Sequence, residues 1–112
     1  MTIYINGGTI SVDTTQQSVS YIDDTDSPYT MTATEEALMV DCQNGAVSVT
    51  TNNSQDIGDT IIISDLNGYC SLNNITIDSP LGTIDGANFT ILNNDYASIT
   101  IMYLGSNNWK II

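Results

Sequence analysis

The sequence predicts an all-β protein, an antiparallel sandwich or a barrel-like domain, and two features carry this prediction. Apolar residues recur at every second position in short runs such as IIISD (61–65), NITID (74–78) and SITIMY (98–103). This period places one face of a strand toward a core and the other face toward water. Turn-forming sequences separate the runs at about the spacing expected of a sandwich or barrel.

In the first half of the chain, short alternating runs lie on both sides of an Asn6-Gly7-Gly8 turn, and Asp26-Ser27-Pro28 marks a later turn. The best helical candidate, TEEALM (34–39), runs directly into Val40 and a Gln43-Asn44-Gly45 turn, so a strand is preferred there. The strands predicted in this half cover residues 2–5, 9–12, 17–22, 29–33, 37–41 and 46–51.

The second half has the clearer alternation. Asn67-Gly68 supplies the positive φ that a tight hairpin turn needs, and Ser79-Pro80, Asp85-Gly86 and Gly105-Ser106-Asn107 mark further turns. The strands predicted here cover residues 59–64, 73–77, 88–92, 97–103 and 108–112.

Length and charge restrict the function. At 112 residues, with 41% hydrophobic residues, the chain has the size of one domain. The chain has thirteen acidic residues and one basic residue, Lys110, so the formal net charge is −12. Binding to nucleic acid or to an anionic membrane needs clustered Lys and Arg, so both are excluded. The acidity itself has two interpretations that stay open, solubility or a surface complementary to a basic partner.

The chain has no hydrophobic segment of the signal-peptide type after Met1, and its apolar runs are far shorter than a bilayer span. We therefore expect no membrane insertion, and folding and assembly in a cytoplasm.

A family resemblance rests on the order of motifs in the second half of the chain. A G-x-x-I-x-I-x-D-x-x-G strand is followed by NNITI, an I-D-G turn and a closing G-x-x-x-W-x-I-I, which resembles bacteriophage fibre and virion-surface modules. Looser matches lie upstream, where the chain departs from the family pattern in having Thr51-Asn52-Asn53 in place of Leu-Pro-Ala. The resemblance covers residues 28–112. Its motif positions are Gly58, Ile61, Ile63, Asp65, Gly68, 73–77, Ile84, Asp85, Gly86, Gly105 and 109–112, with 29–34, 38–41 and 44–50 upstream.

The resemblance implies a homotrimer on the virion surface, assembled in the host cytoplasm. A boundary at residues 23–28 separates residues 1–27, which are N-terminal strands of the same sandwich or a docking arm, from residues 28–112, the β-sandwich-like virion-surface module. The small size fits a capsid decoration or accessory head protein that docks on other virion proteins. The alternative is the receptor-binding tip or another component of a tail fibre, which would contact host-surface glycans. A soluble carbohydrate- or ice-binding module is a third hypothesis.

An enzyme is not expected. The chain has no histidine, so the commonest general base and metal ligand is missing and no Ser-His or Cys-His nucleophile can be assembled. A pair of carboxylates, as in glycoside hydrolysis, remains the one feasible catalytic arrangement. Glu35 and Glu36 are adjacent, however, and would point to opposite faces of a strand.

Metal binding is predicted only at Asp23, Asp24 and Asp26, an acidic loop that would offer three oxygen ligands to calcium, with a solvated acidic turn as the alternative. No other cofactor is expected. Cys42 and Cys70 lie outside any C-x-x-C motif, and a cytoplasmic location favours two reduced thiols over a disulfide.

Two sets of binding residues complete the prediction. The closing strand offers Trp109, Ile111 and Ile112 as a subunit interface. Under the tail-fibre hypothesis, turn residues would bind sugars, whereas their ordinary role is turn formation. These residues are Asn52, Asn53, Asn67, Tyr69, Asn107 and Asn108.

Overall fold

The computed structural model describes residues 2–6, 9–13 and 18–112, with side chains from residue 18 onward. Within these ranges strands are the main regular secondary structure and there is almost no helix, which confirms the predicted all-β class. The helical structure described is one 3-10 turn, η1 (Asp24–Asp26). The strands are β1 (Thr2–Asn6), β2 (Thr9–Asp13), β3 (Val19–Asp23), β4 (Tyr29–Thr30), β5 (Ala37–Asp41), β6 (Val47–Thr50), β7 (Thr60–Asp65), β8 (Ile75–Asp78), β9 (Thr83–Ile84), β10 (Phe89–Leu92), β11 (Ser98–Gly105) and β12 (Asn108–Ile111).

Two sheets form the body of the protein, in the strand orders β3-β5-β7-β11-β12-β9 and β10-β8-β6-β4. Both are mixed, so the predicted antiparallel arrangement is wrong. From β3 to β8 the chain alternates between the sheets, and successive strands of one sheet therefore run in the same direction. β3, β5 and β7 are parallel neighbours, as are β4, β6 and β8. Antiparallel pairing begins where β10 and β11 return beside β8 and β7.

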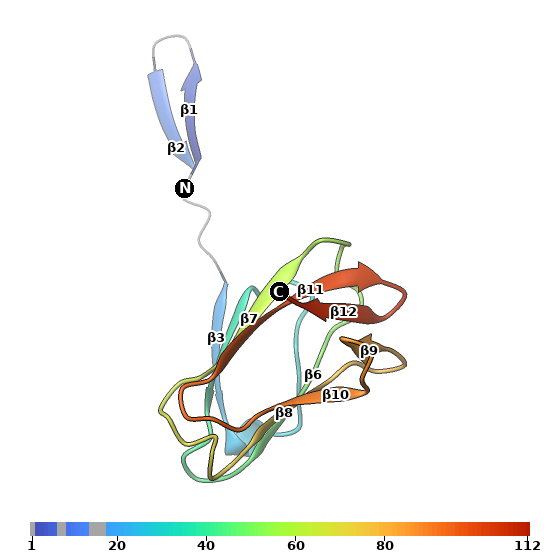
Figure 1. Ribbon diagram of the computed structural model, residues 1–112. Coiled ribbons are helices and arrows are strands. Elements are labelled where there is room, and N and C mark those ends of the chain that lie inside the picture. Colours follow the sequence, from blue (N-terminus) through green and yellow to red (C-terminus); the bar gives the residue numbers. More distant parts are fainter. Residues whose placement is uncertain (1, 7–8, 14–17) are drawn as a thin grey trace.

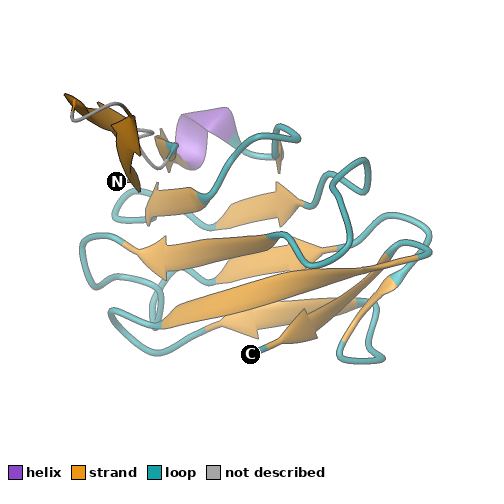
Figure 2. Cartoon of the chain, turned by 90° about the horizontal axis from the view of Figure 1, so that it is seen from above, coloured by secondary structure: helices purple, strands orange, loops and turns teal. Residues whose placement is uncertain are grey.

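One hydrophobic core unites the two sheets. Alternate residues of β7 and β8 are fully buried, as the period-2 pattern predicts: Ile61 and Ile63 on β7, and Ile75 and Ile77 on β8. The single tryptophan, Trp109, is 1% exposed, and its ring lies 5.0 Å from that of Tyr103. The loops gather at the two ends of the strands (Figure 2).

β1 and β2 form a separate two-stranded sheet. Among the described strands they hydrogen-bond only with each other, and the hairpin stands apart from the body (Figure 1). β3, in contrast, pairs with β5 along its length and contributes Ile22 to the core. The part of the predicted 1–27 arm that lies apart is therefore the hairpin, whereas residues 19–26 belong to the body; residues 1, 7–8 and 14–17 lie outside the described ranges.

Candidate functional site

A pocket of about 500 Å³ lies between the segment that precedes β5 and the loop that leads to β7. Glu35 at this pocket is 3% exposed, although its neighbour Glu36 is exposed. The Tyr29 hydroxyl donates a hydrogen bond to Glu35 Oε1. The pocket is lined by Ala33, Thr34, Glu35, Glu36, Gln55, Asp56, Gly58, Asp59 and Thr60.

Two buried polar atoms at this pocket, Glu35 Oε2 and Gln55 Nε2, have no hydrogen-bond partner among the described residues. Burial raises the pKa of Tyr29 to about 12, and the bond to Glu35 acts in the same direction, so this hydroxyl keeps its proton and donates at neutral pH. A buried polar group without a partner costs free energy, and it marks a place where a ligand or water supplies the missing bond. The sequence drew attention to Glu35 only as one of two adjacent carboxylates. It did not connect Glu35 with Gln55, because Gln55 is an ordinary loop residue with no motif around it.

A second polar centre surrounds Asp65, the last residue of β7, which is 2% exposed. Its carboxylate accepts backbone N–H bonds from Gly68 (3.0 Å), Cys70 (3.1 Å) and Tyr96 (2.9 Å). Burial by itself would raise the pKa of Asp65, but these hydrogen bonds outweigh it and lower the pKa to about 2. Asp65 thus joins the turn after β7 to the turn before β11.

The ligand atoms of Asp65, Cys70 and Asp95 lie within 4.8 Å of one another, which is close enough for a metal site. The chemistry of the donors is unfavourable, however. Burial raises the pKa of Cys70 to about 11, so at neutral pH its thiol keeps the proton that a metal would displace, and it donates to Asn94 O (2.7 Å). The Asp65 oxygens already accept backbone N–H groups. We therefore assign this cluster a structural role.

Cys42 and Cys70 are both buried and free. Cys42 Sγ lies 3.6 Å from Asp65 Oδ1 and donates to it. Burial raises the pKa of Cys42 to about 12, and the negative charge of Asp65 adds to the effect. Both thiols are therefore protonated and shielded, which is typical of structural rather than reactive cysteines.

The predicted calcium loop forms the cap of η1. Asp23 accepts hydrogen bonds from Thr25 N (2.9 Å) and the Thr25 hydroxyl (2.5 Å), and Asp26 accepts from Asp23 N (3.0 Å). This is a capping box, in which the side chains satisfy backbone N–H groups at the start of the turn. Hydrogen bonding from Thr25 lowers the pKa of Asp23. Calcium binding at Asp23, Asp24 and Asp26 stays a prediction.

Asn53, one of the residues predicted to bind sugars, lies at the centre of an internal network. Its Oδ1 accepts hydrogen bonds from Trp109 Nε1 (2.9 Å), the Thr51 hydroxyl (3.0 Å) and the Ser79 hydroxyl (3.3 Å). Its Nδ2 donates to Pro80 O (2.8 Å). The network ties the loop after β6 to the turn after β8 and to β12.

The other predicted loop residues have mixed roles. Asn52 and Asn108 are half-buried and accept hydrogen bonds from Ser54 N and the Thr83 hydroxyl, respectively. Asn107 has φ 64, a left-handed conformation that asparagine tolerates in turns. Asn67 and Tyr69 are exposed in the turn after β7, while Asn108 also lines a second hollow.

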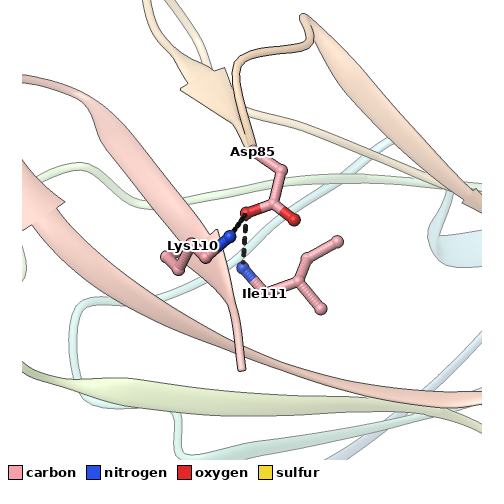
Figure 3. A network of polar contacts seen from close by, with 3 residues as sticks. All are labelled: Asp85, Lys110 and Ile111. Carbon is pink, nitrogen blue, oxygen red and sulfur yellow. Dashed lines mark hydrogen bonds and ion pairs between the residues drawn. The ribbon is translucent and has the colours of Figure 1, made fainter.

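The predicted interface strand β12 is held by Asp85. One oxygen of this carboxylate accepts from Ile111 N (3.0 Å) and pairs with Lys110 Nζ (3.2 Å), as Figure 3 shows. The Ile111 hydrogen bond is the main cause that lowers the pKa of Asp85. Trp109 is buried in the core and Ile111 is half-buried, whereas Ile112 is 61% exposed. Of the three predicted interface residues, Ile112 is the one with a largely exposed side chain.

No protein-family model matches the chain, and no curated protein matches it. Within the described ranges, no helix has the length and apolarity needed to span a membrane.

Proposed function

We propose that this protein is a non-enzymatic bacteriophage structural protein, a capsid decoration or accessory head protein that docks on the virion surface. The observation that carries the proposal is the separation of the β1–β2 hairpin from the two-sheet body. The motif resemblance of residues 28–112 to virion-surface modules supports the same class, and the lack of histidine supports a non-catalytic role.

The hairpin has the pattern of an element that needs a partner surface. Its register pairs Ile3 with Val12 and Ile5 with Ile10, so these four apolar positions lie on one face of the ribbon. An isolated two-stranded hairpin is at best marginally stable in water, because it cannot bury one face alone. Docking on a shell protein would cover these positions and leave the body facing outward.

We also propose that the body is a sandwich and that it assembles as a trimer through the outer face of its six-stranded sheet. The strand register places eight residues of four neighbouring strands on this face. They are Val19 and Tyr21 on β3, Ala37 and Met39 on β5, Ile62 and Ser64 on β7, and Ser98 and Thr100 on β11. None of these eight residues is charged, although the same face carries the pair of Asp23 and Asp41 at its end and Lys110 on β12. Copies of a chain with net charge −12 repel one another, so we propose that they meet at this uncharged patch.

The location of the protein is tested by antibody-gold electron microscopy of virions from the bacteriophage that encodes it. Label spread regularly over the head is expected. Label confined to the tail tip would overturn the decoration role and support the receptor-binding alternative.

A binding assay tests the role of the hairpin. The variant Ile5→Asn/Ile10→Asn should no longer bind purified shells, while the body keeps its thermal midpoint. The control, Thr9→Asn/Ser11→Asn, changes positions on the other face of the hairpin and should bind normally.

The trimer is tested by light scattering coupled to size-exclusion chromatography. The wild-type protein should elute with the mass of a trimer, and Ile62→Glu should elute as a monomer, because a charge in the centre of the uncharged patch opposes association. Phe89→Glu is the matched control. It adds the same charge on β10, at a side chain that is 51% exposed on the other sheet, and should remain trimeric. A wild-type monomer, or equal effects of the two variants, would contradict this interface.

A further inference from the structure

We propose that the pocket at Glu35 and Gln55 binds an arginine side chain together with a neighbouring peptide carbonyl of a partner protein. The inference rests on the proposed docking function only for the source of that peptide. Its chemistry is argued from the pocket alone.

The two unpartnered atoms define what the ligand must offer. Glu35 Oε2 is a buried acceptor and requires a donor, and Gln55 Nε2 is a buried donor and requires an acceptor. Both residues line one pocket and are at least nine-tenths buried, Glu35 at 3% and Gln55 at 9% exposure. A basic side chain beside a peptide carbonyl supplies both, since its N–H groups reach the carboxylate and the carbonyl accepts from the amide.

The charge around the pocket selects a cation. Glu36, Asp56 and Asp59 line it together with Glu35, and no lining residue is basic. Charge-assisted hydrogen bonds to a carboxylate are stronger than neutral ones, and they gain further strength where burial excludes water.

The arrangement of the carboxylates favours a guanidinium over a metal ion. Among the described residues, the one group of three metal-ligating atoms within 4.8 Å of one another is that of Asp65, Cys70 and Asp95. No three carboxylates of this pocket therefore converge on a point. A guanidinium spreads five N–H donors over a planar fork and reaches acceptors that lie apart, whereas an ammonium or a metal ion acts as a point charge. The volume of about 500 Å³ accommodates such a side chain.

The inference is tested by titrating the ¹⁵N-labelled protein with N-acetyl-arginine methylamide and following amide chemical shifts. Saturable shifts are expected for residues 33–36 and 55–60 and for the side-chain NH₂ of Gln55, with a dissociation constant in the millimolar range. The citrulline analogue has the same shape without the charge and should give no saturable shift. The lysine analogue should bind more weakly than the arginine analogue.

Glu35→Gln should weaken binding of the arginine analogue by about tenfold, because a hydrogen bond to a buried charge is lost. The matched control is Asp24→Asn, which removes one charge at a side chain outside the pocket and should bind as the wild type does. If Glu35→Gln does not fold, Asp56→Asn takes its place, since no hydrogen bond within the described part of the chain uses the Asp56 carboxylate. A smaller loss is expected. Equal binding of arginine and citrulline analogues, shifts scattered over the whole surface, or equal losses in Asp24→Asn would overturn the inference. This test uses no virion, so its failure leaves the decoration role to be judged by the gold labelling.

Discussion

Replacing Asp65 by asparagine is expected to lower the free energy of unfolding at pH 7 by about 2 kcal/mol, because the fold holds the pKa of this carboxyl at about 2, below its ordinary value of 3.8. The physical cause is the set of backbone N–H groups of Gly68, Cys70 and Tyr96 that point at one buried carboxylate. Asparagine removes the charge that these donors stabilise and turns an N–H₂ group toward at least one of them. Urea unfolding followed by the fluorescence of Trp109 measures the loss.

The pH dependence has a definite sign. The pKa of Asp65 is lower in the folded than in the unfolded protein, so its stabilising contribution is complete above about pH 4 and is lost as the pH falls toward 2. The difference in stability between wild type and Asp65→Asn should therefore shrink over this interval. Asp95→Asn is the control, since its exposed carboxylate accepts one hydrogen bond, from Ser71 N. Equal losses in the two variants, or a difference that does not change between pH 5 and pH 2, would contradict this role of Asp65.

Asn53→Ala should lower the free energy of unfolding by about 2–3 kcal/mol, because it leaves the buried Trp109 Nε1–H without an acceptor and removes the bond to Pro80 O. Asn52→Ala is the matched control. Asn52 is the adjacent asparagine and is also half-buried. Among the described residues its side chain accepts only from Ser54 N, so a loss below about 1 kcal/mol is expected.

The same pair of variants separates a structural role from sugar binding, because both asparagines belong to the loop predicted to contact glycans. If Asn53→Ala unfolds at the same denaturant concentration as Asn52→Ala, the network around Trp109 does not hold the loop. Asn53 would then be available for a ligand.

The positions of the strands could be predicted from the sequence because burial of one strand face imposes a local period of two residues. The runs around Ile61, Ile75 and Ile101 show this period, and each became a strand with those residues buried. The short β9 was not predicted, since two residues are too few to show any period. The predicted strand at 29–33 is shorter in the structure, where β4 comprises Tyr29 and Thr30 and Met31 is buried beyond its end.

Strand direction could not be predicted in the same way. A parallel and an antiparallel neighbour give the same alternation of buried and exposed residues, so the runs in β5, β6 and β7 fit both. The turn signals suggested hairpins, but the chain crosses from one sheet to the other between these strands. The identity of the neighbours therefore depends on contacts between residues that lie far apart in the sequence.

The candidate sites also divide into features that local sequence predicts and features that depend on contacts between distant residues. The sequence by itself determined the acidic charge, the lack of histidine and the β class, because these depend on composition and on patterns between near neighbours. Only the tertiary structure decided that Asp65 receives an N–H bond from Tyr96, that Asn53 supports Trp109, and that Glu35 and Gln55 share a pocket. Each of these pairs is separated by at least twenty residues along the chain. Their chemistry arises from burial and hydrogen bonding, which exist only after the two sheets have closed around one core.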